Sequence, residues 1–124
     1  MSIFVHGVGM TPFGKLEERT LKELLLEASA EALNDAGNPK VDAVFVGNFM
    51  GGSVYNQEIL GAMVANDLGL GYVPTAKVEG ACASGGIAFR QAVLGILSGE
   101  YDTVLVVGAE KMKHVSTAKV TQAI

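Results

Sequence analysis

Four short apolar runs along the chain predict buried β-strands. They are Ile3–Val8, Val41–Val46, Ala76–Glu79 and Thr103–Val107. The first, second and fourth runs are nearly continuous rather than alternating. Continuous runs are typical of strands buried on both faces of a parallel sheet that helices cover.

Two stretches between these runs carry the apolar stripe of an amphipathic helix. In Leu21–Ala36, Thr20 and Glu23 form the capping-box pattern at the start, and Gly37 is a stop signal at the end. A second helix is expected near Gln57–Leu68.

The third predicted helix, Ala83–Leu97, is apolar nearly all round. Ser84, Arg90 and Gln91 are its clearly polar residues, and a helix of this kind is buried on most sides. Because one face of a sheet cannot cover such a helix, we expect another layer of protein beyond it.

The order of these elements, βαβαβαβ, predicts one α/β domain over residues 1–124, with a mostly parallel sheet covered by helices. Residues 115–124 read as a loop or the start of a helix. Because a compact α/β domain normally ends on a packed element, we expect the domain to be partial, with its closing elements outside these residues.

Composition excludes several classes of protein. Hydrophobic residues make up 49% and charged residues 18%, which excludes a disordered chain. A net charge of −4 argues against nucleic-acid binding through a basic surface. No apolar stretch reaches the roughly 20 residues of a membrane helix, and no secretory signal is readable. The single cysteine excludes internal disulfides and multi-cysteine metal sites, so we expect no metal and a reducing, cytoplasmic location.

Residues Gly9–Leu16 almost match the phosphate-binding pattern GxxxxGK[ST]. Leu16 stands where the pattern needs a hydroxyl, and Glu17 and Glu18 would repel phosphates. The dinucleotide pattern GxGxxG also fails, because Pro12 occupies the third glycine position. We expect a plain turn here, and a nucleotide-binding domain is an alternative that rests only on this defective pattern.

Neither histidine is expected to be catalytic or to bind a metal. His6 lies inside a predicted buried strand and reads as a core imidazole, and His114 lies in a polar loop. The charged groups at Glu17–Arg19 and at Glu110 and Lys111 are expected to be solvated rather than acid–base pairs.

Cys82 is the main candidate for chemistry. It lies in Val78–Gly86, where a predicted strand gives way to a helix. The positive end of a helix dipole favours a thiolate, and small neighbours leave room for a thioester and for N–H groups that hold an oxyanion. A small core cysteine is an equal alternative from these residues alone. The combination of strand, tight junction and buried helix favours a nucleophile.

The segment Val78–Gly86 closely resembles the nucleophilic-cysteine segment of thiolases, especially those of the sterol-carrier-protein type and archaeal and bacterial acetyl-CoA acetyltransferases. Gly7–Gly14 resembles their opening strand and turn, and Gly99–Met112 resembles their next strand and GxExM segment. The resemblance covers essentially the whole chain. It implies the N-terminal half of a thiolase fold.

The resemblance implies that Cys82 attacks the thioester of an acyl-CoA and becomes acylated. A second acyl-CoA, deprotonated at its α-carbon, then takes the acyl group; in reverse, CoA cleaves a 3-ketoacyl-CoA. Acyl-CoA and CoA are then substrates, and no cofactor is bound.

The same resemblance implies that partner groups lie elsewhere. In thiolases the catalytic histidines, often a second cysteine, and much of the CoA contact surface come from the C-terminal half. The 124 residues alone are therefore expected to be inactive. The resemblance further implies homo-oligomers that pair the edge strand near Thr75–Glu79 with its copy.

Two other interpretations stay open. A condensing relative, such as a hydroxymethylglutaryl-CoA synthase or ketoacyl synthase, would use the same cysteine with other partner groups. A non-catalytic thiolase-like scaffold or lipid-carrier-associated protein would keep Cys82 only for packing. High reactivity of Cys82 near neutral pH would distinguish the enzymes from the scaffold.

Overall fold

A computed structural model describes all 124 residues and contains one sheet of three parallel strands. The strands are β1 (Ala43–Gly47), β2 (Thr75–Val78) and β3 (Val104–Gly108). Their order in the sheet is β2-β1-β3, so β1 is central, and Phe45 pairs with Ala76 on one side and Val106 on the other. The predicted α/β fold with a parallel sheet is confirmed.

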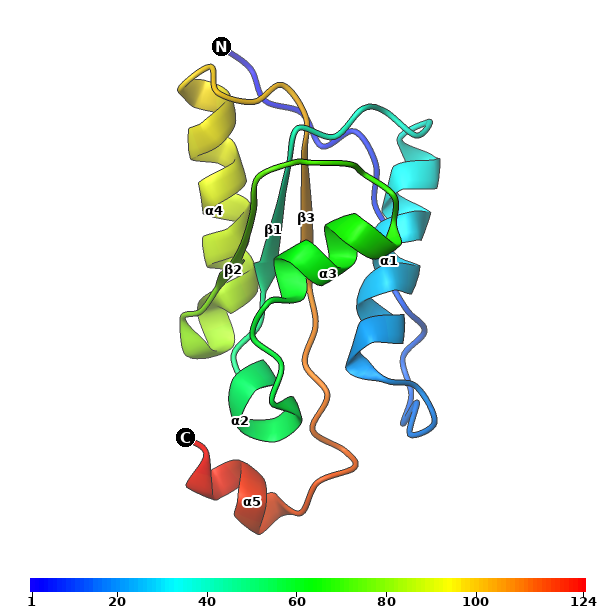
Figure 1. Cartoon of the computed structure of the whole chain (residues 1–124), viewed down its shortest axis with the longest axis vertical. Coiled ribbons are helices and arrows are strands. Elements are labelled where there is room, and N and C mark those ends of the chain that lie inside the picture. Colours follow the sequence, from blue (N-terminus) through cyan, green and yellow to red (C-terminus); the bar gives the residue numbers. More distant parts are fainter.

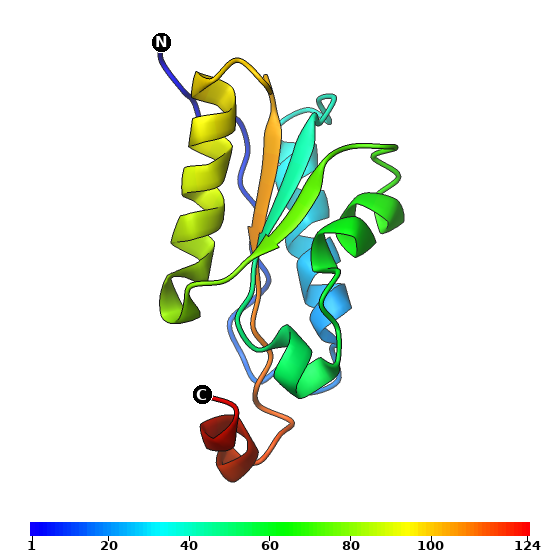
Figure 2. The same cartoon turned by 60° about the vertical axis from the view of Figure 1, so that its left-hand side comes forward.

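Helices cover both faces of this sheet. They are α1 (Leu21–Asp35), α2 (Gly51–Tyr55), α3 (Leu60–Asp67), α4 (Ser84–Leu97) and α5 (Thr117–Gln122). One face carries α4, and the other carries α1 and α3 (Figure 2). None of the helices is both long enough and apolar enough to cross a membrane.

The first helix has the boundaries that its pattern predicts. The Thr20 hydroxyl accepts the N–H of Glu23 at 3.1 Å, and the Glu23 carboxylate accepts the N–H of Thr20 at 2.6 Å. Both halves of the capping box are therefore formed. Beyond the helix, Gly37 has φ +76°, a left-handed conformation that favours glycine.

The core lies between the sheet and the pair α1 and α3. Its most buried side chains are Leu25, Val44, Val46, Leu60 and Val64. The expected second helix near Gln57–Leu68 is shorter than predicted. A separate helix, α2, precedes it, and Asn56 in the left-handed conformation (φ +54°) ends α2.

The side of α4 that packs on the sheet consists of small residues: Ser84, Ala88, Ala92 and Gly95. Gly95 admits the ring of Tyr101, because a Cβ at Gly95 would lie 2.6 Å from a ring carbon. The large residues Phe89, Leu94 and Leu97 are exposed. The helix therefore leaves an apolar side uncovered in this chain, as expected of a helix that one sheet face cannot bury.

The predicted strand Ile3–Val8 is wrong, and the chain has three strands instead of four. This N-terminal segment runs along the length of the sheet beside α1 (Figure 1). The N–H of Val8 donates to Asp35 at 2.9 Å, and the N–H of Met10 donates to Glu31 at 2.8 Å. Carboxylates of α1 thus accept hydrogen bonds from backbone N–H groups that, in a strand, would donate to the carbonyl oxygens of a neighbouring strand. His6, expected in the core, is exposed.

A cavity of about 820 Å³ lies between this segment and the sheet. The cavity is lined by residues 2–9, by β3 and by parts of α1 and α4. Because β3 pairs only with β1, its other edge faces this space. Gly7 and Gly9 instead let the segment approach α1 closely, since a Cβ at either would clash with the α1 backbone.

Candidate active site

Cys82 lies in a short turn between β2 and α4. The turn Ala81–Ala83 is a 3-10 helix, and α4 begins directly after it at Ser84. The sequence prediction of a strand-to-helix junction is confirmed. The thiol is free and exposed, not packed in the core of this chain.

The turn is held in an uncommon backbone conformation. Ala81 has φ +50°, a left-handed value that costs a residue with a Cβ about 1 kcal/mol. Its N–H donates to the Glu79 carboxylate at 2.5 Å. The Ser84 hydroxyl accepts the N–H of Gly80 at 3.0 Å and donates to the carbonyl oxygen of Ala81 at 2.7 Å. These hydrogen bonds offset the cost of the conformation that presents Cys82.

Two glycines bring the start of α4 against the end of β1. A Cβ at Gly47 would lie 2.7 Å from the Cα and from the N atom of Gly85, closer than such atoms pack. At the end of β3, a Cβ at Gly108 would lie 3.6 Å from the Gly47 carbonyl oxygen. Backbone therefore packs directly on backbone beneath Cys82.

A hollow of about 370 Å³ opens beside the thiol, and we call it the Cys82 hollow. It is lined by Cys82 itself, by Phe49, Glu110 and Met112, and by Gly47, Gly85 and Gly108. Its other lining residues are Ala81, Ser84 and Ala109. Its walls thus come from the Cys82 turn with the first residues of α4, and from the loops that follow β1 and β3.

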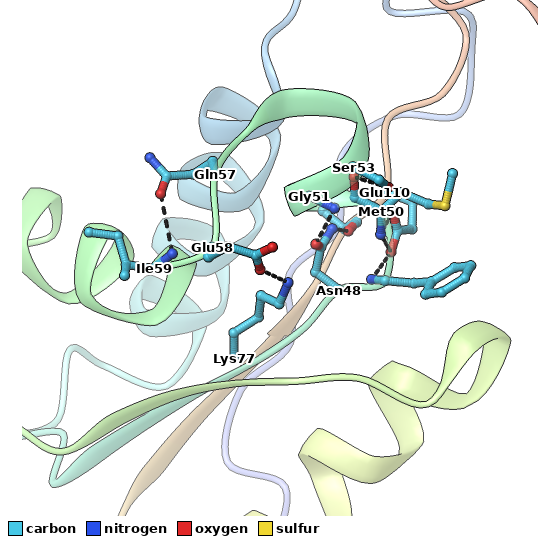
Figure 3. A network of polar contacts seen from close by, with 11 residues as sticks. Asn48, Met50, Gly51, Ser53, Gln57, Glu58, Ile59, Lys77 and Glu110 are labelled. Carbon is cyan, nitrogen blue, oxygen red and sulfur yellow. Dashed lines mark hydrogen bonds and ion pairs between the residues drawn. The ribbon is translucent and has the colours of Figure 1, made fainter. Parts of the chain in front are cut away.

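Asn48 joins the two loops at the carboxyl ends of β1 and β3. Its side chain is fully buried. The carboxamide nitrogen donates to the carbonyl oxygen of Ala109 at 2.8 Å, and the carboxamide oxygen accepts the N–H of Gly51 at 2.8 Å. Figure 3 shows Asn48 beside Gly51 at the start of α2. A buried amide with both ends paired fixes the separation of the loops.

Glu110 makes a second link between the same loops. Its carboxylate accepts the N–H of Phe49, and its oxygens lie 3.2 and 3.3 Å from the N atom of Met50 (Figure 3). Lys111 is buried and its Nζ donates to the carbonyl oxygen of Leu16 at 2.7 Å. The expectation of a solvated charge is therefore wrong for Lys111, whereas Glu110 is exposed and its carboxylate also accepts backbone N–H groups. Asn48 directly follows the buried strand β1, and Glu110 and Lys111 lie within three residues of the end of β3, so a polar residue just beyond a buried strand is the sequence signal for these roles.

The histidines do not line the Cys82 hollow. His6 lines the cavity beside β3 instead. The Nδ1 atom of His114 lies 2.9 Å from the Tyr55 hydroxyl, which also donates to the carbonyl oxygen of Lys111 at 2.5 Å. Burial raises the pKa of Tyr55, and the negative charge of Glu110 raises it further.

The glycine-rich stretch near the N-terminus has no helix to present to a phosphate. Residues 9–16 contain only bends and irregular structure, and the first helix begins at Leu21. A phosphate-binding loop requires a helix N-terminus directly after the loop. No group of three or more histidine, cysteine, aspartate or glutamate side chains is arranged to hold a metal ion.

Comparison with protein families places the whole chain in one of them. The family model described as "Thiolase, N-terminal domain" matches residues 3–124. An acetyl-CoA acetyltransferase of Methanocaldococcus jannaschii is 42% identical in an alignment of 118 positions that covers 94% of this chain and 30% of that protein. Sterol carrier protein 2 of Gallus gallus is 38% identical in an alignment of 123 positions that covers 94% of this chain and 21% of that protein.

The fold has a close counterpart among solved structures. The crystal structure of 3-oxoacyl-[acyl-carrier-protein] synthase III from Aquifex aeolicus VF5 matches with a TM-score of 0.68 and 26% identity. The match covers 76% of this chain and 30% of that one. The chain thus spans less than a third of the length of these relatives.

Proposed function

Because the chain belongs to the thiolase family, with the N-terminal domain over residues 3–124, we propose that it is the part of an acyltransferase that carries the nucleophile. The observation that carries this proposal is the placement of Cys82. Its free thiol is exposed on a strained turn at the start of a 14-residue helix, beside a hollow. Strain and a helix dipole at a reactive side chain are typical of a nucleophile.

The proposed first step is acylation of Cys82. The Cys82 thiol gives its proton to a base, and the thiolate Sγ attacks the carbonyl carbon of an acyl-CoA. The bond from that carbon to the sulfur of CoA breaks, and the base returns the proton to that sulfur, so that CoA leaves as a thiol. The acyl group is then held as a thioester on Cys82. In the second step the α-carbanion of another acyl-CoA attacks this thioester, and the Cys82 thiolate is released.

The start of α4 is suited to hold the negative oxygen of such a step. Ala83, the residue at the N-cap, offers no side-chain acceptor to the first N–H groups of the helix, in contrast to Thr20 at the start of α1. N–H groups at a helix N-terminus favour an anion in front of them. We assign the oxyanion of the first step to this position.

The remaining catalytic groups are assigned to a C-terminal half. The Cys82 hollow contains no histidine and no second cysteine, and its carboxylate, Glu110, already accepts backbone N–H groups. A base for the thiol and an acid–base group for the α-proton must therefore be supplied from outside these 124 residues. The uncovered side of α4 is the surface we assign to that half, and the edge strand β2 is assigned to pairing with a second copy.

Coenzyme A release from acetyl-CoA tests this proposal. It is measured for the chain assembled with its C-terminal half, for the chain alone, and for the assembled Cys82→Ser variant. The proposal is supported if only the assembled wild-type protein releases coenzyme A, and neither the chain alone nor the assembled Cys82→Ser variant does. Equal release by wild type and Cys82→Ser contradicts it, as does full turnover by the 124 residues alone.

A condensing relative is the second candidate, favoured by the likeness to the Aquifex aeolicus synthase. Both candidates begin with acylation of Cys82, and they differ in the acceptor of the acyl group. Transfer to acetyl-CoA indicates a thiolase, whereas transfer only to a substrate on an acyl carrier protein indicates the synthase. A thiol that alkylates no faster than a model thiol supports the non-catalytic scaffold instead.

A further inference from the structure

The wall of the Cys82 hollow includes two large apolar residues. They are Phe49, in the loop after β1, and Met112, in the loop after β3. The floor is made of backbone at Gly47, Gly85 and Gly108. Among the residues that bound the space beside the thiol, the glycines cannot be displaced without moving β1, β3 or α4, and Phe49 and Met112 are the two large apolar ones.

The loop that carries Phe49 is fixed to the loop that carries Met112. Glu110 accepts the N–H groups at positions 49 and 50, and Asn48 donates to Ala109. Hydrogen bonds therefore cross between the loops that follow β1 and β3, and Figure 3 shows Glu110 beside Met50 at this crossing. Because these loops are fixed relative to each other, the hollow cannot widen freely to admit a larger group. The side chains of Phe49 and Met112 then determine how large a group it admits.

We propose that Phe49 and Met112 determine the size of the acyl group that Cys82 accepts. This inference rests on the proposed acylation of Cys82. An acyl group bonded to Sγ has to lie in the hollow, against the residues that line it. The thiol end of CoA needs part of the same space. Phe49 is a stiff ring, whereas Met112 is a flexible side chain that adapts to its neighbour, so Phe49 sets the stricter limit.

The test compares acyl transfer to Cys82 from acetyl-CoA and from octanoyl-CoA in the protein assembled with its C-terminal half. Wild type, Phe49→Ala, Phe49→Leu and Met112→Ala are measured by the rate of acyl-thioester formation. Phe13→Ala is the matched control, because Phe13 is exposed and does not line the hollow. The readout is the ratio of the octanoyl rate to the acetyl rate.

Phe49→Ala is expected to raise this ratio by about tenfold or more, since removing steric exclusion in an apolar pocket is worth roughly 10–200-fold. Phe49→Leu and Met112→Ala are expected to raise it less, and Phe13→Ala is expected to leave it at the wild-type value. An unchanged ratio in Phe49→Leu and Met112→Ala overturns the inference even where Phe49→Ala does not fold. Absence of acylation from both donors in the wild type overturns the proposed function itself, so the two failures are distinguishable.

Discussion

Gly47 at the end of β1 and Gly85 in the first turn of α4 pack backbone against backbone, with no room for a Cβ on Gly47. This contact sets how closely the helix that follows Cys82 approaches the central strand. The position of the Cys82 thiol relative to the strand ends therefore depends on residue 47 having no side chain.

Gly47→Ala is expected to move α4 away from the sheet. The added Cβ would lie 2.7 Å from the Cα of Gly85, and overpacking of this kind costs about 1–3 kcal/mol. The free energy of unfolding should fall by this amount, and alkylation of Cys82 by iodoacetamide should slow. Gly86→Ala is the matched control, because a Cβ there meets nothing within 4 Å. Equal effects of the two substitutions would contradict the role of the Gly47 contact.

Glu110→Ala is expected to loosen the loop that follows β1. Its carboxylate accepts the N–H groups of Phe49 and Met50, and losing a hydrogen bond of this kind costs about 1 kcal/mol. Hydrogen exchange at these two amides should become faster. Glu110→Gln keeps an oxygen that accepts the same donors, so it should retain most of the protection. Equal loss in both variants would show that the charge, and not the acceptor, is what matters.

Asp42 is expected to make stability depend on pH in the acidic range. Its carboxylate accepts the N–H of Thr103 and the N–H of Asp102, each at 3.1 Å, and these hydrogen bonds hold its pKa below the usual value of 3.8. A lowered pKa in the folded state gives stability that is present above the unfolded pKa and is lost as the pH falls through the folded one.

Urea denaturation of wild type and Asp42→Asn measures this effect. Asparagine still accepts an N–H but carries no charge. The difference in the free energy of unfolding should be largest near neutral pH and should shrink below about pH 4. A difference that is constant with pH would exclude titration of Asp42 as its cause.

The uncovered side of α4 is expected to make the isolated chain associate. Phe89, Leu94 and Leu97 are 51%, 42% and 50% exposed on one helix, and large exposed apolar side chains favour association. Leu97→Gln combined with Phe89→Ser should reduce both sedimentation as oligomers and binding of a hydrophobic dye. Phe13→Ser is the control, because Phe13 is 94% exposed but lies outside this helix. A monomeric wild-type chain that binds no dye would contradict the expectation.

Local patterns account for the parts of the fold that were predicted correctly. The capping box at Thr20 and Glu23 fixed the start of α1, and the apolar run Val41–Val46 marked the central strand. In each case the physical cause acts within a few residues, so it is readable from the sequence. The same holds for the junction at Cys82, where a strand ends and a helix begins.

Contacts between distant segments account for the errors. The run Ile3–Val8 has the composition of a buried strand, but strand formation requires a neighbouring backbone, and the segment lies on α1 instead. The sequence around Glu110 is typical of a solvated charge. The backbone N–H groups that its carboxylate accepts, those of Met50 and Phe49, lie 60 and 61 positions earlier in the chain. The hydrophobic periodicity of the sequence does not predict contacts between residues so far apart in the chain. For the same reason it does not predict the contact between Gly47 and Gly85.

The most direct test of the central claim, that Cys82 is the residue acylated by acyl-CoA, is peptide mass spectrometry after acid quenching. The protein assembled with its C-terminal half is incubated with acetyl-CoA, digested and sequenced by fragmentation. The account predicts one acetyl group as a thioester on the peptide that contains Cys82, and no such group in Cys82→Ser. An unmodified Cys82, or an acetyl group that persists in Cys82→Ser, would contradict it.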